Sequence, residues 1–139
     1  MRQSHRTIAL KTQGQGLYEF TPDARAFLRA SGLRLGQLTL YCRHTSASLL
    51  IQENADPTVV EDLNTFFSQI APEGRGLYIH ETEGPDDMPA HIRAALTQTS
   101  LTIPFAEGEL SLGTWQGLYL FEHRRAAHRR EIVLHAIGD

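Results

Sequence analysis

The chain has 139 residues, and its 13 Lys and Arg against 16 Asp and Glu leave a net charge of −3. This length fits a single domain over residues 1–139, and a hydrophobic content of 41% excludes a wholly disordered chain. The slight negative charge argues against nucleic acid as the main partner, because phosphate backbones attract clustered positive charge.

The first elements predicted along the chain are two strands and a helix. Residues 6–10 and 17–20 have strand composition and flank Gly14-Gln15-Gly16, which indicates a hairpin. Thr21-Pro22 is typical of a helix start, with the threonine as the cap and the proline in the first turn. Gly32 is typical of a helix end.

Two strands and the clearest helix follow. Residues 37–43 alternate between apolar and polar side chains, which places Leu38, Leu40 and Cys42 on one face of a strand, and residues 48–52 predict the next strand. Asp56-Pro57 is typical of a helix start. An apolar stripe at helical spacing continues from there through Val59, Val60, Leu63, Phe66, Phe67 and Ile70.

The second half of the chain predicts a short strand at 76–80, an acidic loop at 81–87 and a helix that begins at Pro89. We expect the apolar side chains of this helix to pack inward, namely Ile92, Ala95 and Leu96. The remaining strands are predicted at 100–105, 110–123 and 131–137.

About seven strands with two or three helices predict an α+β domain with a β-sandwich-like core. The segments 118–121 and 132–137 are apolar on both faces. A strand buried on both sides of a small domain must face a second sheet or another subunit, so the pattern also predicts an oligomer.

Cysteine content and the N-terminal residues bear on the cellular compartment. Cys42 is the single cysteine, which excludes an internal disulfide and a Cys-rich zinc site. The polar N-terminus lacks the pattern of a signal peptide, and no apolar stretch approaches the ~20 residues that span a bilayer. We therefore expect a cytoplasmic protein without a membrane partner.

A first polar cluster combines residues 44–48 with residues 52–56. As a functional site, this cluster would form the floor of a pocket. Hydroxyls such as those of Thr45 and Ser46 would donate hydrogen bonds there to an anionic group. The alternative is a Ser/Thr turn followed by a helix cap at Asp56, with His44 as a hydrogen-bonded buried histidine.

A second cluster contains His80, the acidic loop with Asp87, and His91. Together with His44, the two histidines can form a three-histidine site for zinc or a similar divalent ion, with one coordination position open. The alternative is an exposed acidic loop beside a histidine in the first turn of a helix.

Two further clusters lie near the C-terminus. Strand parity places Gln116 and Glu122 on one face with two leucines, which suggests a general base in an apolar pocket. Alternatively, Trp115 fills the core and Glu122 pairs with an arginine. Residues 123–130 contain four arginines, which indicate either phosphate or pyrophosphate binding or a solvated hairpin turn.

Taken in order, these clusters resemble the YjbQ-type family, also described as secondary thiamine-phosphate synthases. The matching segments are residues 44–48, 53–59, 83–92 and 113–117, and the resemblance runs from near Arg6 to the C-terminus. It implies an α+β fold, a homotrimer with a pocket near subunit contacts, and a small phosphorylated metabolite as the ligand.

The resemblance also implies roles for individual residues. The metal ligands it implies are His44, His80 and His91, for zinc or, with pyrophosphate, magnesium. The catalytic residues it implies are Glu122, His91 and Gln116. The substrate-binding residues are Thr45, Ser46, Glu53, Asn54, Asp87, His123 and Arg124. Many relatives have an Asp-Gly-Pro-Arg turn after Glu122, where this chain has His123-Arg124-Arg125, so His123 is a candidate fourth ligand or proton shuttle.

The activity that the resemblance implies is the joining of a pyrimidine pyrophosphate to a thiazole phosphate, with release of pyrophosphate. Two alternatives remain open from the residues. One is a metal-dependent hydrolase, since a three-histidine metal site suffices for hydrolysis. The other is a non-enzymatic trimer that binds a metabolite or stores metal.

Overall fold

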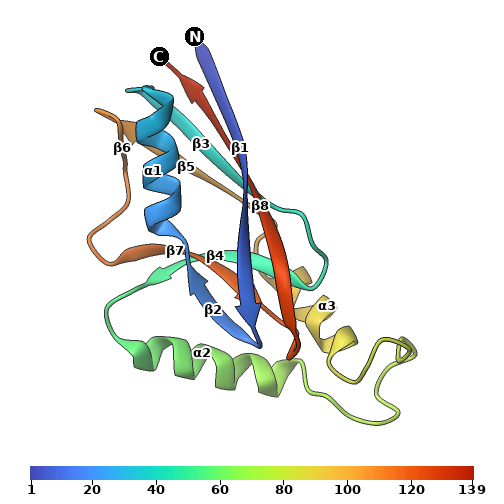
Figure 1. Cartoon of the computed structure of the whole chain (residues 1–139). Helices are drawn as coiled ribbons and strands as arrows, with labels where there is room; N and C mark the ends of the chain where they lie inside the picture. The colour runs from blue at the N-terminus through green and yellow to red at the C-terminus, as the bar shows by residue number, and fades with distance from the viewer.

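Eight strands form two antiparallel sheets in the computed structural model, which describes all residues from 1 to 139 (Figure 1). One sheet has the order β1-β8-β3-β5-β6 and the other β2-β7-β4. The elements are β1 Arg2–Gln13, β2 Gly16–Glu19, α1 Thr21–Ser31, β3 Gly36–Cys42, β4 Ala47–Glu53, α2 Pro57–Ile70, α3 Asp87–Leu96, β5 Ser100–Ala106, β6 Glu109–Leu110, β7 Gln116–Glu122 and β8 Ala127–Gly138. The predicted α+β domain with a core between sheets is confirmed.

The predicted hairpin between the first two strands is wrong. β1 pairs along its whole length with β8, from Arg2 opposite Gly138 to Gln13 opposite Ala127, whereas β2 pairs with β7 in the other sheet. Gly14 and Gly16 both have positive φ, and they turn the chain out of one sheet into the other. A full-length partner gives β1 more hydrogen bonds than the four-residue β2 could, and it brings the two termini side by side (Figure 1).

The core lies between the inner faces of the two sheets. The alternation predicted for β3 is confirmed, because Leu38 and Leu40 are fully buried and lie opposite Ala136 and Leu134 of β8. Leu120 of β7 packs into the same cluster from the second sheet, and α1 covers the remaining part of the first sheet. Each fully buried aliphatic side chain of this kind contributes about 1.5–3 kcal/mol to folding.

The helix starts predicted from the sequence are confirmed in part. At α2, the Asp56 side chain accepts from the backbone N–H of Thr58 at 2.9 Å and Pro57 is the first residue, as predicted. At α1, Thr21 is the first helical residue rather than the cap. Its hydroxyl donates to Glu19 and accepts from the backbone N–H of Leu118, so it joins the helix to β7. Gly32 ends α1 in the left-handed conformation, as predicted.

Two expectations about the region before β5 are wrong. Residues 76–80 form no strand and belong to the loop between α2 and α3. α3 begins at Asp87 rather than Pro89, and its buried face includes Ala90 and Arg93, while Leu96 is 59% exposed. The apolar pattern failed here because two polar side chains of α3 have buried partners, Arg93 at the carbonyl of Ala71 after α2 and Asp87 at Arg124 after β7.

β7 is buried on both faces, and the cover comes from the same chain. Leu118 and Leu120 face the core, whereas Phe121 meets Phe67 of α2 edge to face, with ring centroids 5.2 Å apart. The predicted apolar stripe of α2 is otherwise largely open, and Phe66 is 53% exposed. Trp115 is 62% exposed, so the expectation that it fills the core is wrong. No helix is long and apolar enough to cross a membrane.

Phe67 and Phe66 are neighbours with opposite environments, and they test how α2 is held. Phe67→Ala should lower the free energy of unfolding by about 3–5 kcal/mol, because it leaves a cavity against Phe121. Phe66→Ala, the matched control, should cost well under half as much. Chemical denaturation of both variants measures the difference, and equal losses would contradict the packing described.

Candidate metal centre

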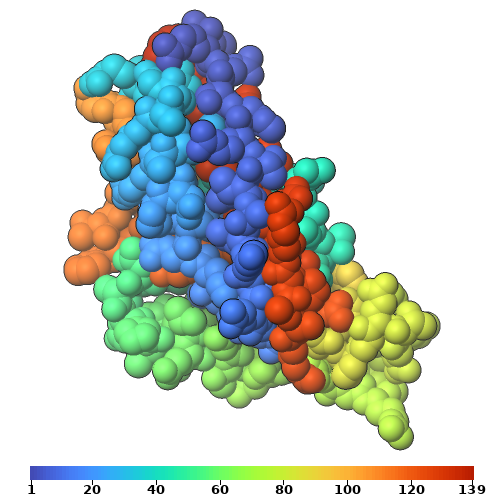
Figure 2. Space-filling view, viewed as in Figure 1, coloured from blue at the N-terminus to red at the C-terminus, as the bar shows by residue number.

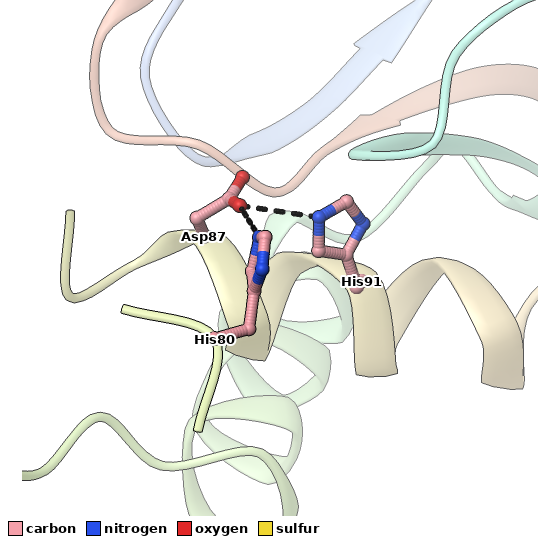
Figure 3. Close-up of side chains that lie close together, drawn as sticks. All are labelled: His80, Asp87 and His91. Carbon is pink, nitrogen blue, oxygen red and sulfur yellow. Dashed lines mark hydrogen bonds and ion pairs between the residues drawn. The ribbon is translucent and has the colours of Figure 1, made fainter. Parts of the chain in front are cut away.

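His80, Asp87 and His91 converge at the start of α3 (Figure 3). His80 comes from the α2–α3 loop, while Asp87 and His91 lie one helical turn apart on α3. Asp87 Oδ2 is 2.7 Å from His80 Nε2 and 3.1 Å from His91 Nε2. The three ligand atoms all lie within 4.8 Å of one another. Two imidazole nitrogens and one carboxylate oxygen are a donor set for a divalent transition ion.

The hydrogen bond at His91 Nδ1 determines whether Nε2 is free to bind a cation. His91 Nδ1 is 3.0 Å from the carbonyl oxygen of Thr45. A carbonyl oxygen only accepts, so Nδ1 carries the proton and, in a neutral ring, Nε2 carries a lone pair. That lone pair faces Asp87 Oδ2, which also only accepts when ionised. The contact therefore requires either a second proton on Nε2, which makes His91 a cation paired with Asp87, or a metal ion bound by both groups. A backbone carbonyl that fixes the tautomer is typical of metal-ligating histidines.

Arg124 holds the Asp87 carboxylate in place. Its Nη1 donates to Asp87 Oδ1 at 2.7 Å and its Nε to Asp86 Oδ2 at 3.0 Å. The Asp87 side chain is only 2% exposed. Burial alone would raise the pKa of Asp87, but hydrogen bonding to His80 and the charges of His91 and Arg124 lower it overall, which favours the ionised carboxylate. Arg124, predicted to bind substrate, is thus committed to the two aspartates.

His44 lies outside the group that contains the other two predicted histidine ligands. Its Nε2 accepts a hydrogen bond from the backbone N–H of Glu131 at 2.7 Å. Burial, followed by the charge of Arg130, lowers the pKa of His44 and favours the neutral ring. The structure thus groups His80 and His91 with Asp87 instead. The Asp-x-x-x-His spacing of Asp87 and His91 on one helix is the sequence signal that could have identified Asp87 as a ligand.

Glu122 is fully buried and paired with an arginine, as one of the two alternatives predicted. Its oxygens accept from Arg130 Nε at 2.8 Å, from Arg130 Nη2 and from the hydroxyl of Thr12. Burial would raise the pKa of Glu122, but these hydrogen bonds and the arginine charge lower it overall. Arg130 also donates to the hydroxyl of Ser46. Glu122 and Ser46 therefore form an internal network behind the metal group.

His123 lies in the same buried layer. Its ring is fully buried, its Nε2 is 2.8 Å from the Ser48 hydroxyl, and its centroid is 4.4 Å from that of Phe121. Burial, aided by the nearby charge of Arg93, lowers the pKa of His123 to about 3. This histidine is therefore neutral at physiological pH and is not part of the metal group.

Gln116, Glu53 and Asn54 gather at the other end of β7. Gln116 lies opposite Glu53, and six residues of strand, about 20 Å, separate it from Glu122. Asn54 donates to Glu19, and Gln116 accepts from the backbone N–H of Gly113. Within one chain, the predicted site residues thus form two separate clusters rather than one.

A pocket of about 410 Å³ adjoins the metal group under the α2–α3 loop. This loop protrudes at one corner of the molecule (Figure 2). The residues that line the pocket include Arg75, Tyr78 and His80 of the loop and Met88 of α3. Arg75 is exposed and takes part in none of the ion pairs of the chain. Sequence reasoning missed this pocket, because residues 76–80 read as a strand.

Comparison with known proteins gives consistent matches over nearly the whole chain. The family described as "UPF0047 protein YjbQ-like" matches residues 6–139. The UPF0047 protein sll1880 of Synechocystis is 51% identical over 99% of this chain and 94% of its own length. The UPF0047 protein YjbQ of Escherichia coli O157:H7 is 38% identical over 96% and 97% of the two chains. A crystal structure of a YjbQ/UPF0047 family protein from Clostridium acetobutylicum superposes with a TM-score of 0.88 at 33% identity, covering 95% and 99%.

The neutral, buried His123 should make folding sensitive to acid. The unfolded chain takes up a proton near the ordinary value of 6.5, whereas the folded ring resists protonation down to about 3. Stability should therefore be lost as the pH falls between these values, by up to about 1.4 kcal/mol per unit. His123→Gln should flatten this slope in urea unfolding measured from pH 7 to pH 4.

The control for this experiment is His5→Gln, which removes a histidine from an exposed position on β1. It should keep the wild-type pH dependence. If both variants show the same slope as wild type, His123 does not carry the effect.

Proposed function

The chain belongs to the YjbQ-like UPF0047 family, and from this premise we propose that it is a metal-dependent enzyme that acts on a small phosphorylated metabolite. The observation that carries the proposal is the His91 ring, whose Nδ1 is engaged by the Thr45 carbonyl while its Nε2 faces the Asp87 carboxylate. A neutral ring in that position is a ready ligand for a cation.

The donor set indicates which metal the site takes. His80 and His91 offer imidazole nitrogens, which suit zinc and other first-row transition ions, whereas magnesium prefers oxygen ligands. Asp87 adds one carboxylate. We therefore favour zinc or a similar transition ion at this centre, with magnesium entering only together with a pyrophosphate.

The pocket beside His80 suits a small metabolite, because binding sites for such ligands start at about 300 Å³. Arg75 in its wall is free to attract a phosphate. A divalent ion at the centre would supply Lewis acidity toward a phosphate oxygen. Asp87 and His91 would hold that ion, while Arg124 keeps the carboxylate oriented.

In its specific form, the proposal is thiamine-phosphate formation. The thiazole nitrogen would bond to the methylene carbon of the pyrimidine, and the carbon–oxygen bond to pyrophosphate would break. Release of a pyrophosphate anion is the step that a nearby cation and arginines favour. His91 is the proposed catalytic side chain in this form, and Glu122 is a positioning residue that acts through the turn that it fixes.

The second candidate is a metal-dependent hydrolase of a small phosphoester. Three protein ligands with an open position are typical of hydrolytic zinc sites. The group of His80, Asp87 and His91 has this composition.

We also propose that the protein works as a homotrimer. Ile79, directly before the ligand His80, is fully exposed, and Ile70 at the end of α2 is 43% exposed. Apolar side chains this open beside a candidate site support a subunit contact there.

Removal of one ligand should abolish metal binding. Asp87→Asn keeps the size of the side chain but removes its charge, and we expect zinc affinity to fall by at least about 100-fold in calorimetry. Glu83→Gln is the matched control, because it removes an exposed carboxylate of the same loop and should bind zinc like wild type. Equal zinc affinity in both variants and in His91→Ala would refute the centre.

Activity should require the same residues. Protein purified without a histidine tag, loaded with zinc and given both thiamine precursors with magnesium, should release pyrophosphate and form thiamine phosphate. Asp87→Asn should lose this turnover, and Glu83→Gln should keep it. Turnover of phosphoesters without joining of the precursors would favour the hydrolase. If wild-type turnover does not exceed that of Asp87→Asn with any of these substrates, the enzymatic proposal is overturned.

A further inference from the structure

A second cavity adjoins the metal group, between α3 and the segment that joins β3 to β4. Its volume of about 580 Å³ lies in the range of small-molecule sites. His91 lines this cavity, whereas His80 lines the pocket under the α2–α3 loop, and the two cavities share no lining residue. The group of His80, Asp87 and His91 therefore borders two separate cavities.

Hydrogen bonds tie α3 to the opposite wall of the second cavity at both of its ends. Near the start of the helix, His91 Nδ1 donates to the carbonyl oxygen of Thr45 at 3.0 Å. Beyond its end, the backbone N–H of Cys42 on β3 donates to the carbonyl oxygen of Thr99 at 2.8 Å. All four residues line the cavity. Its shape is therefore set before a ligand binds, which lowers the entropic cost of binding.

His44 brings a hydrogen-bond donor to the lining of the second cavity. Its Nε2 accepts the backbone N–H of Glu131, so Nε2 carries a lone pair and the ring is neutral with its proton on Nδ1. The half-buried ring makes no other hydrogen bond, and it lines the cavity. His44 Nδ1 is therefore a donor that no group of the chain uses.

Arg43 adds a positive charge to the same lining. Its Nη1 is 3.1 Å from Glu131 Oε2, and Arg129 pairs with the other oxygen of that carboxylate at 2.9 Å. Two arginines thus share one carboxylate, which leaves one net positive charge, and only Arg43 of the three lines the cavity. The Arg43 side chain is 55% exposed and keeps N–H groups for a ligand. A cation together with a neutral N–H donor suits an anionic oxygen such as that of a phosphate.

The remainder of the lining suits a flat apolar ring. Ala94 and Ala95 of α3 contribute small side chains, and Tyr41 of β3 contributes an aromatic ring that is 49% exposed. Small side chains leave room for a ligand, and an open aromatic ring offers a surface for stacking. The cavity thus combines an apolar surface with an anion-binding pair, which matches the chemistry of a phosphorylated heterocycle.

We propose that the second cavity binds a heterocyclic phosphate as the acceptor substrate, while the pocket beside His80 binds the pyrophosphate substrate. Tyr41 and the alanines of α3 hold the ring, and Arg43 and His44 bind the phosphate. A joining reaction needs two subsites that are filled together beside the reacting centre, and two cavities at one metal group supply them. The inference rests on the proposed function for the identity of the ligand, and it makes His44 a ligand-binding residue rather than a metal ligand.

Ala95→Trp tests the cavity by filling it, and it removes no hydrogen-bonding side chain, charge or metal ligand. Because Ala95 is exposed, the variant should unfold at the wild-type temperature. Calorimetry of the zinc-loaded protein with thiazole phosphate should show affinity at least about tenfold weaker than wild type, because the indole occupies the space of the ligand. Inorganic pyrophosphate should bind as in wild type, since the other cavity is unchanged. Ala95→Ser is the matched control, because it keeps the cavity open and should bind both probes normally.

Arg43→Met and Arg129→Met test the phosphate contact as a matched pair. Each removes one exposed arginine from Glu131, but only Arg43 lines the cavity. Arg43→Met should bind thiazole phosphate at least about tenfold more weakly and bind the unphosphorylated thiazole like wild type. Arg129→Met should bind both like wild type. Equal affinity for thiazole phosphate in the two variants would contradict the assigned contact.

Three further outcomes would overturn the second subsite. One is unchanged binding of thiazole phosphate by a folded Ala95→Trp. Another is competition between saturating pyrophosphate and thiazole phosphate in the wild type, because two cavities can be filled together. The third is a change in molar mass of Ala95→Trp in light scattering, which would place the cavity at a subunit contact. If Ala95→Trp does not fold, the two arginine variants and the competition experiment decide.

Zinc binding and turnover measured on the same samples distinguish failure of the subsite from failure of the proposed function. Ala95→Trp and Arg43→Met should bind zinc like wild type, because neither removes a ligand of the metal. Wild-type turnover by Ala95→Trp at low thiazole phosphate would refute the subsite and leave the proposed function standing. Binding of thiazole phosphate that Ala95→Trp and Arg43→Met weaken, in a protein without zinc binding or turnover, would support the subsite and refute the metal-dependent enzyme.

Discussion

The buried ion pair between Glu122 and Arg130 joins the two sheets, and the candidate site is built outward from it. Glu122 ends β7 of the small sheet, while Arg130 lies on β8 and Thr12 on β1 of the large one. Arg130 reaches on to Ser46, just before β4. Neither charged group is accessible to water, so loss of either partner would leave an uncompensated charge in the interior. This pair therefore connects the two sheets through the interior of the domain.

Fixing that junction also fixes the metal group. The backbone N–H groups of His123 and Arg124 both donate to Glu122, which sets the turn that follows β7. From this turn, Arg124 reaches Asp86 and Asp87 and holds the first turn of α3. Two of the three candidate ligands are thus connected to the sheet junction by hydrogen bonds. His80, whose side chain is 47% exposed, comes from the loop alone.

Local signals in the sequence predicted what local interactions decide. The start of α2 follows from Asp56 and Pro57, and the buried face of β3 follows from alternation, because both depend on neighbours along the chain. The pairing of β1 with β8 was not predictable in the same way, since it joins residues more than 110 positions apart. The two histidines of the site were predicted, but Asp87 was not predicted as a ligand. Its orientation depends on Arg124, 37 residues away along the chain.

The charges around the site argue for an anionic ligand. Asp86 and Asp87 carry two negative charges, and Arg124 neutralises one of them. A bound divalent ion would therefore leave one formal positive charge at the centre, and Arg93 of α3, which has no carboxylate partner, adds a second positive charge to the same helix. Low-dielectric surroundings strengthen this field, because Asp87 and Arg93 are both almost fully buried. A neutral substrate would leave these charges uncompensated, whereas a phosphate would neutralise them. This balance of charges therefore supports the proposal of a phosphorylated metabolite over that of a neutral ligand.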